Sequence, residues 1–311
     1  MNRVSAGRFV SLFMSYFFLL LTATRAIAQS ETDSLRQLND RLDSLFIDEV
    51  EDRRTPDKVL HAEPLYIDLI RDLGARKGER EWNVGMGLTD NLYYDTYDML
   101  IEYEWAPVNR LGLEVEIPIT LYGINGRDSG QNGLAIPPAN RIESLKLAAQ
   151  WSFLVSERAK TTLALGYINS IKLADIQDLS RVSTVTGNQF NPFLIAAKRW
   201  GNRFHTLVYT GPVLTYAFQS KHWKSRFEMN SSVHYMIPGT RNFVGLEVNQ
   251  SVAGRQSSVV MRPQLRVGVT SNLLLGIVTG IPLSRQEQRL SSFLRLIYEP
   301  AHKNRKPVQN G

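Results

Sequence analysis

Histidine and carboxylate side chains are the residues whose types could support catalysis or metal binding in this chain. His61 and Glu63 stand two positions apart, so on an extended segment both side chains point the same way and could share one proton or one ion. A single pair of ligands is too few for a zinc site. His205, His222 and His234 show no ligand spacing, and the chain has no cysteine. We therefore expect capping and loop anchoring from His61 and Glu63, and neither a metal centre nor a cofactor.

Nucleophilic catalysis and nucleic-acid binding also lack a sequence basis. The chain carries no glycine-flanked serine of the nucleophile-elbow type, and its histidines share no discernible site. Its basic residues do not gather on one face, as those of a nucleic-acid binder would. We predict that the protein is not an enzyme and binds no nucleic acid.

Charged residues recur at alternate positions within otherwise apolar segments. Because successive side chains of a strand point to opposite faces, this alternation places the charges on one face and the apolar residues on the other. We predict that the charged face lines the lumen of a β-barrel. The expected lumen residues are Asp98, Glu102, Glu104, Glu114, Glu116, Lys146, Arg226, Arg262, Arg266 and Arg295.

The lumen charges allow two interpretations. The acidic residues come from the second and third expected strands and the basic ones mostly from later strands, so the two rows would face each other across the ring. If water fills the lumen, this field favours dipolar or zwitterionic solutes. If side chains fill it, the same charges form an interior salt-bridge network. Residues 61–78 lie at the expected periplasmic mouth and could enter the lumen, which favours a narrow or plugged channel.

The elements that would position these charges are strands, because the dominant period from Glu79 onward is two. Trp82, Val84, Met86 and Leu88, for example, share one face of the first segment. Alternation over about ten residues is what a membrane-crossing strand requires. The expected strands number twelve and lie near 79–88, 97–105, 111–119, 145–155, 160–172, 189–200, 203–218, 225–237, 242–252, 258–270, 272–282 and 289–299. They predict an all-β, antiparallel up-and-down transmembrane barrel.

The connections between these strands sort by length. Short ones lie at 106–109, 156–159, 201–202, 238–241 and 271, and longer ones at 123–140, 173–188, 219–224, 253–257 and 283–288. Tight turns on one rim and longer loops on the other are typical of outer-membrane barrels, in which the tight rim is periplasmic. A periplasmic β-sandwich could alternate too, but nothing would force its loops to sort in this way.

Residues 1–28 have the pattern of a cleaved signal peptide. Arg3 and Arg8 precede an apolar run over 9–21, and Ala26-Ile27-Ala28 gives the small-residue cleavage pattern. Removing residues 1–28 lowers the formal net charge from +6 to +3. No later stretch is apolar for long enough to span a membrane as a helix, which leaves a closed barrel as the spanning structure. We expect the outer membrane as the location, with its lipid and the barrel-assembly machinery as partners.

The segment before the barrel is expected to be helical in two places. Leucines at three- and four-residue spacing predict an amphipathic helix over 30–49, which either packs on the barrel mouth or binds a partner or another copy. A charged linker follows. Pro64 at a first helical position and Gly74 at an end predict a second, short helix over 64–73. The expected divisions are thus 29–60, a mouth or plug segment at 61–78, a barrel at 79–299 and a polar tail at 300–311.

One run of this segment resembles a known family. His61-Ala62-Glu63-Pro64-Leu65-Tyr66, with 72–79 and Glu81-Trp82-Asn83-Val84-Gly85, resembles the N-terminal motif of an uncharacterised family of outer-membrane barrels from Bacteroidota. More distantly, the chain resembles the porin-like barrels grouped with transporters of the MetA pathway of phenol degradation. The residues of this motif expected at the mouth or in a plug are His61, Glu63, Pro64, Tyr66, Asp72, Gly74 and Arg76.

These patterns lead to one main functional expectation. We expect a narrow, porin-like channel or transporter for small polar solutes. The alternative is a structural, adhesion or assembly barrel without conductance, and a more remote one is an outer-membrane hydrolase. The solute and the oligomeric state do not follow from the sequence.

Overall fold

The computed structural model describes residues 33–52, 55–67, 73–124, 137–176, 184–284 and 288–300. The expected signal peptide, most of the polar tail and Asp72 lie outside these residues. Among the described helical residues, none forms a helix that is both long and apolar enough to cross a membrane.

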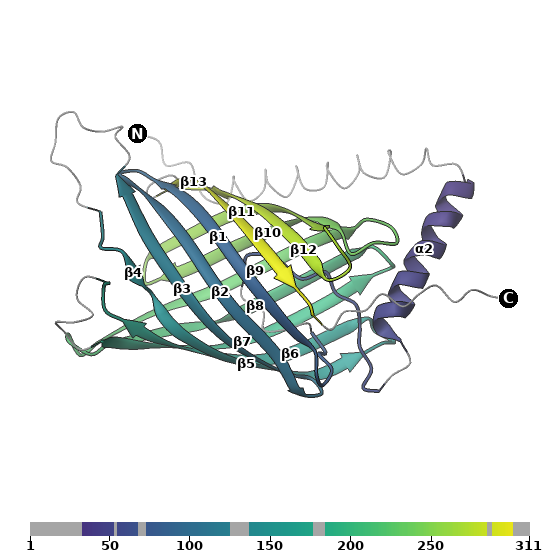
Figure 1. Ribbon diagram of the computed structural model, residues 1–311, viewed down its shortest axis with the longest axis horizontal. Coiled ribbons are helices and arrows are strands. Elements are labelled where there is room, and N and C mark those ends of the chain that lie inside the picture. Colours follow the sequence, from purple (N-terminus) through teal and green to yellow (C-terminus); the bar gives the residue numbers. More distant parts are fainter. Residues whose placement is uncertain are drawn as a thin grey trace.

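Long antiparallel strands make up most of the described chain after residue 79 (Figure 1). The strands are β1 (Arg80–Asn91), β2 (Tyr94–Val108), β3 (Leu111–Ile124), β4 (Arg141–Ile142), β5 (Ser144–Ser156), β6 (Thr161–Leu173), β7 (Val185–Trp200), β8 (Phe204–Ala217), β9 (His222–Met236), β10 (Phe243–Ala253), β11 (Gln256–Gly268), β12 (Leu273–Pro282) and β13 (Gln288–Tyr298).

The sheet closes on itself, because β1 pairs with β2 on one side and with β13 on the other. The short β4 pairs with β3 at Ile119 and Thr120, and β5 continues along the same strand from Leu111 to Glu116. β4 and β5 are therefore one crossing interrupted at Glu143. This gives a closed antiparallel barrel of twelve strands and confirms the fold predicted from the alternation.

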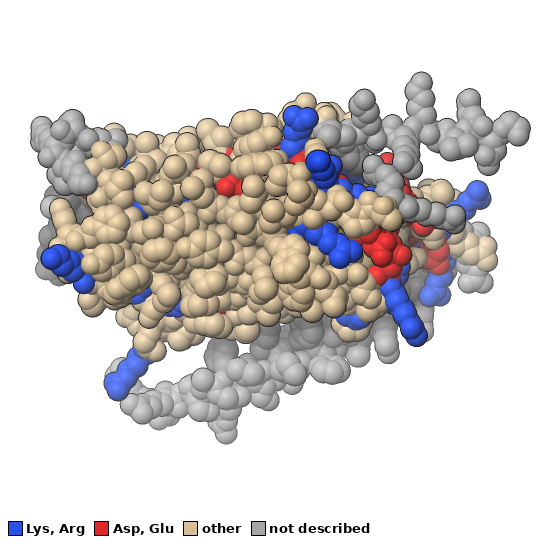
Figure 2. Space-filling view, turned by 90° about the horizontal axis from the view of Figure 1, so that it is seen from below, with Lys and Arg blue, Asp and Glu red and all other residues tan. Residues whose placement is uncertain are grey.

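The two faces of the barrel differ as the alternation requires. On β1, Trp82, Val84 and Met86 are exposed on the outside, whereas Asn83 between them is buried inside. On the face shown in Figure 2, the middle of the outer wall carries few charged side chains, and the visible Lys, Arg, Asp and Glu gather mostly toward the ends. A closed ring satisfies every strand's backbone groups internally, which is the condition for a sheet to lie in lipid.

Loop lengths sort less sharply than expected. The rim nearest the N-terminal helix has connections at 109–110, 157–160, 201–203, 237–242 and 269–272, and the opposite rim has the two longest ones, 125–140 and 174–184. That opposite rim also carries two tight turns, at 92–93 and 254–255. In the second of them Gly254 has a φ of 59°, a left-handed conformation that two-residue hairpin turns use and glycine adopts at low cost.

Helix α2 (Asp33–Glu51) lies across one end of the barrel (Figure 1). Arg203, in the turn between β7 and β8, binds Asp43 at 2.6 Å and Asp40 at 2.9 Å. Asp43 also accepts the backbone N–H of Gly239 at 2.9 Å. The helix therefore packs on the barrel mouth through its acidic face, as one of the two alternatives predicted.

The second expected helix, over 64–73, is wrong in the part that the structure describes. Residues 64–67 are not helical, and residues 68–72 lie outside the described chain. Glu63 does not cap a helix: its carboxylate accepts the N–H of Leu73 at 2.8 Å and so closes a loop. Tertiary contacts override the local helical preference here, since Leu65 packs in a buried cluster with Leu274 of the barrel wall and Tyr66 lies against Arg262.

Candidate functional site: a plug inside the barrel

The plug segment, of which the structure describes residues 61–67 and 73–78, contacts strands on different sides of the ring. His61 Nε2 lies 2.9 Å from Thr162 Oγ1 on β6. The N–H of Leu65 donates to Gln264 Oε1 on β11 at 2.7 Å. The N–H of Gly74 donates to Ser152 Oγ on β5 at 2.9 Å. A segment that reaches β5, β6 and β11 at once lies inside the barrel.

Lumen side chains take up the backbone donors of this segment. Ala62 N–H donates to His205 Nδ1 at 2.9 Å, and Glu247 accepts backbone hydrogen bonds from Tyr66 and Ile67. A buried donor left unsatisfied would cost about 1–3 kcal/mol. These acceptors therefore stabilise a non-helical chain in a place where water is largely excluded.

The apolar side chain of Leu65 seats the plug on the wall. It belongs to a buried cluster that includes Leu274, Val278 and Phe293. Gly276 makes room for it, because a Cβ at that position would lie 2.8 Å from Leu65 Cδ2. The absence of a side chain at 276 is thus a packing requirement for the plug.

Tyr66 is held between two wall residues. The guanidinium carbon of Arg262 lies 3.3 Å from the centroid of the Tyr66 ring, and the ring of Phe293 meets it edge-on at 5.7 Å. A cation over an aromatic face is attractive, and more so where water is excluded. Arg262 also donates to Asn249 at 2.6 Å and to Ser291 at 3.1 Å, which fixes it beneath the ring.

Ion pairs and hydrogen bonds connect the plug and the residue before it to the end of α2 and to the barrel mouth. Arg76 pairs with Asp52 at 3.0 Å and donates to the carbonyl oxygen of Glu51 at 2.9 Å. The carboxylate of Glu51 accepts the N–H of Leu60 at 2.9 Å and the guanidinium of Arg199 at 2.5 Å. The last residues of α2 are therefore bonded to both the plug and the barrel wall.

His61 is a buried titratable residue of the plug. Burial, together with the nearby His205 and Arg199, lowers the pKa of His61 from 6.5 to about 3. Its imidazole is therefore neutral at neutral pH. Glu63 accepts the N–H of Leu73, whereas His61 Nε2 contacts Thr162 Oγ1, so the two side chains anchor the plug at different places.

Buried carboxylates gather beside the plug on β2 and β3. Glu102, Glu104 and Glu114 can bring one oxygen each within 4.8 Å of one another. Carboxylate oxygens are ligands for divalent cations, but Glu102 already has a cation, since Arg295 donates to both of its oxygens at 2.7 and 2.8 Å. Asn83 donates to Glu102 at 2.6 Å and to Glu104 at 2.9 Å. The group is part of an interior ion-pair and hydrogen-bond network.

The charges pair with near neighbours, so the expectation of two opposed rows is wrong for the pairs that the structure shows. Glu116 on β3 binds Lys146 on β5 at 2.7 Å, and β3 and β5 are adjacent. Arg226 binds Glu228 of its own strand at 2.7 Å. Near pairs are favoured over rows opposed across the ring, because attraction between charges falls with distance and a buried charge needs a partner.

The remaining expected lumen residues lie on the inner face with local partners. Asp98 is half-buried and accepts the hydroxyl of Thr120 at 3.1 Å. Arg266 donates to the carbonyl oxygen of Arg241 at 3.1 Å. Arg226 is the most exposed of the expected lumen residues. It lies near the rim opposite α2, and 41% of its side chain is accessible.

Sequence reasoning missed the wall residues that bind the plug. They are Ser152, Thr162, His205, Glu247 and Gln264. Each lies at an inward-facing position of its strand, so the alternation of side chains along the strand would have placed it in the lumen. Nothing in the sequence indicates that a segment 100 or more positions away would meet several of them.

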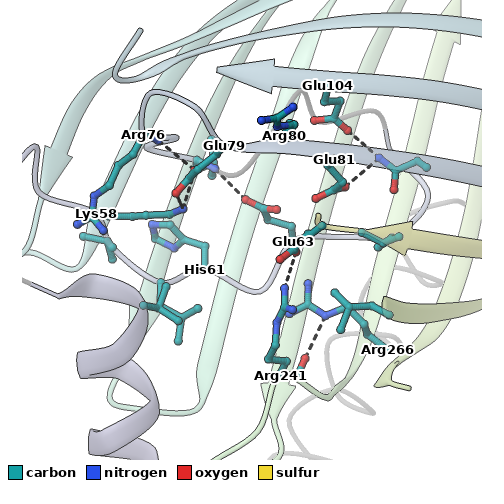
Figure 3. Close-up of a pocket in the computed structure, with 18 of the residues that line it drawn as sticks. Lys58, His61, Glu63, Arg76, Glu79, Arg80, Glu81, Glu104, Arg241 and Arg266 are labelled. Atoms are coloured by element: carbon teal, nitrogen blue, oxygen red, sulfur yellow. Dashed lines mark hydrogen bonds and ion pairs between the residues drawn. The ribbon is translucent and has the colours of Figure 1, made fainter. Parts of the chain in front are cut away.

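The plug separates two cavities. The helix-side cavity has a volume of about 540 Å³ and is lined by His61, Glu63, Pro64 and Leu65 together with mouth residues (Figure 3). The loop-side cavity has a volume of about 350 Å³ and is lined by Tyr66 and Ile67 together with strand residues. Leu65 and Tyr66, consecutive in the chain, face different cavities, so this part of the plug is the partition between them.

Comparisons with known proteins agree with this fold. A family model described as HAEPLYID-like matches residues 57–299. No curated protein matches the sequence. Among solved structures, an outer membrane channel from Pseudomonas putida F1 matches with a TM-score of 0.58 and 13% identity, over 75% of this chain and 99% of that one. KdgM porin and NanC porin match with TM-scores of 0.47 and 0.48 and identities of 10% and 9%, each over 70% of this chain and 98% of the other.

Proposed function

This chain belongs to the HAEPLYID-like family, whose model spans its plug and its barrel, and we propose that it is an outer-membrane channel for small polar solutes that its own plug segment closes. The observation that carries the proposal is the pair of cavities with the plug as partition. Each cavity lies on one side of residues 65–66. Withdrawal of this short stretch would join them into one path along the barrel axis.

The outer wall and the expected export signal support the location. Apolar residues such as Met86 and Ile101 are exposed on the outside with fractions of 58% and 53%, which suits contact with lipid. Because a barrel of this kind is exported and then assembled in the membrane, the expected signal peptide at 1–28 would serve its delivery, and the assembly machinery and lipid would be its partners.

The lining of both cavities supports polar solutes. Residues with amide, hydroxyl or charged side chains are the majority of those that line the loop-side cavity, and both signs of charge border the helix-side cavity. An apolar solute would have to strip water from these groups without replacing its hydrogen bonds, which is costly. A polar solute replaces them as it moves.

A reversible cross-link between plug and wall tests the proposal. A Cβ at 276 would lie 3.3 Å from Leu65 Cγ, so the double variant Leu65→Cys, Gly276→Cys brings two thiols within disulfide reach. The chain has no cysteine of its own, so no other disulfide can form. We expect the oxidised variant to be closed in planar bilayers and to conduct after reduction. The single variant Leu65→Cys should not respond to oxidation or reduction in this way.

Deletion of residues 61–78 gives a second measurement. If the plug closes the channel, the shortened barrel conducts continuously. If the native chain, the reduced double variant and the deleted barrel are all resistive in their folded, heat-modifiable form, the channel proposal is wrong.

A second candidate function is a non-conducting structural barrel. The observation that favours it is the number of hydrogen bonds between plug and wall, from His205, Gln264, Ser152 and Glu247. A permanently seated plug would make the barrel an anchor for its loops and for α2. This function predicts no conductance from the native chain and from the reduced cross-link variant alike.

A further inference from the structure

The loop-side cavity has the size of a small-molecule site. Its volume is about 350 Å³, at the lower end of the range of roughly 300–1,000 Å³ that ligand pockets occupy. Tyr66 and Ile67 of the plug form its floor, and residues of β5 to β11 form its walls. A molecule of about monosaccharide size would fit it and would touch the plug directly.

Two cationic side chains line this cavity, and a third lies on β6 next to one of its lining residues. Lys146 on β5 and Arg226 on β9 line it. Lys172 on β6 lies two positions beyond Ser170, the register partner of Lys146, and its charge interacts with those of both Lys146 and Arg226. Like charges repel one another, so each of these cations is stabilised by a nearby negative charge.

The acids near this group are already engaged. Glu116 binds Lys146 at 2.7 Å, and Glu228 binds Arg226 at 2.7 Å. Glu143, the acid that attracts Lys172, is bound by Arg141 at 2.6 Å. Of the cations around this cavity, Lys172 is therefore the one whose charge is least compensated by a close acid among the described residues.

Neutral polar groups line the rest of the wall. Side chains of Ser170, Gln189, Asn191, Asn230 and Asn249 border the cavity. A side-chain amide both donates and accepts hydrogen bonds, so a wall of amides suits hydroxyl groups, which do the same. Together the two features describe a ligand with several hydroxyls and one negative charge.

We propose that the loop-side cavity binds a small hydroxylated carboxylate, with its carboxylate between Lys146, Lys172 and Arg226 and its hydroxyls on the amide wall. The inference deepens the proposed function and rests on it, since the cavity would be the outer half of the solute path. The ligand would lie on Tyr66 and Ile67, so a bound ligand would contact the plug that closes the channel.

A matched ligand series tests the charge requirement. Glucuronate, glucose and glucosamine are similar in size and in their hydroxyl groups. Glucuronate carries a negative charge, glucose is neutral and glucosamine carries a positive charge. We expect isothermal titration calorimetry on the refolded full chain in detergent to give tightest binding for glucuronate, weaker binding for glucose and none for glucosamine. Lys172→Met should lower the affinity for glucuronate by about tenfold or more, as expected for the loss of one charged hydrogen bond. It should leave the affinity for glucose unchanged.

Arg158→Met is the matched control. Arg158 lies in the turn 157–160 at the opposite rim and is exposed, so this variant also removes one positive charge but should not change the affinities. Equal binding of the three sugars, a preference for glucosamine, no binding of any, or an unchanged glucuronate affinity in Lys172→Met would each overturn the inference.

The binding and conductance measurements can contradict the site and the channel independently of each other. Calorimetry in detergent does not require an open channel. If glucuronate binds to a barrel that never conducts, the proposed site is supported and the proposed channel function is contradicted. Conductance without binding of glucuronate would retain the channel and reject the site.

Discussion

His205 Nδ1 accepts the backbone N–H of Ala62 at 2.9 Å, and this bond joins β8 to the plug inside the barrel. An imidazole nitrogen accepts a hydrogen bond only when it carries no proton. The seated plug therefore requires a His205 that is unprotonated at Nδ1. The same place holds His61, whose ring lies 6.4 Å from that of His205, so proton binding on either ring works against the closed state.

Acid should open the plug. His61 has a pKa of about 3 when buried, against 6.5 when free, so the released segment binds a proton that the seated one does not. The stability of the seated plug is complete above about pH 6.5 and is lost progressively as the pH falls from 6.5 toward 3. At pH 4.5 the loss from His61 alone amounts to about 2–3 kcal/mol.

The measurement is single-channel conductance at pH 7.5 and pH 4.5. We expect the open fraction to rise at the lower pH, and to rise less in His61→Gln, which keeps a polar partner for Thr162. The groups that face His61 are His205, Arg199 and Thr162, none of which supplies a compensating negative charge. An open fraction that is constant or falls on acidification would show that these histidines do not control the plug.

A side chain at position 276 should displace Leu65. In Gly276→Ala the new Cβ would lie 2.8 Å from Leu65 Cδ2, closer than packed carbon atoms allow, so the plug must shift. We expect more frequent openings in bilayer recordings, with the barrel still folded. Thr279→Ala changes an exposed, lipid-facing residue of the same strand and should behave like the native chain. Identical recordings from both variants would contradict the seating of Leu65 against Gly276.

Removing the partner of Glu102 should destabilise the barrel strongly. Arg295 and Glu102 are both buried, and breaking such a pair leaves an uncompensated charge at a cost of about 3–5 kcal/mol. We expect Arg295→Met to lower the free energy of unfolding by this order in urea titrations. The double variant Glu102→Gln, Arg295→Met should recover much of the loss, because no isolated charge remains at that pair.

Arg289→Met is the control for this prediction. Arg289 lies 3.5 Å from Asp90, and about a third of each side chain is exposed. Exposed pairs of this kind contribute about 0–1 kcal/mol. A loss for Arg295→Met no larger than that for Arg289→Met would mean that water reaches the Glu102 site.

Loss of Arg203 should release α2 without opening the sheet. Arg203 binds both Asp40 and Asp43 of the helix and lies in a turn, outside the strands. We expect Arg203→Met to make α2 a site of rapid limited proteolysis, while the heat-modifiable mobility of the folded barrel on gels is kept. Exposed Arg158→Met is the comparison, and it should leave the cleavage rate unchanged.

The sequence by itself determined where the strands run and which side chains face inward. Alternation is a local property of the extended backbone, so Glu102, Glu104, Glu114 and Glu116 could be placed on the inner face from their own neighbours. Closure followed from the same pattern, because a one-sided apolar sheet without edges is what lipid accepts.

Only the tertiary structure decided what fills the lumen. The bonds of the plug join residues that are 101, 143 and 199 positions apart, in the pairs His61–Thr162, Ala62–His205 and Leu65–Gln264. Local sequence favoured a helix over 64–73, yet residues 64–67 are not helical, because Leu65 and Tyr66 there pack on the barrel wall. The charges likewise pair with near neighbours, as Glu116 does with Lys146, and the register that brings such residues together is set only when the strands pair.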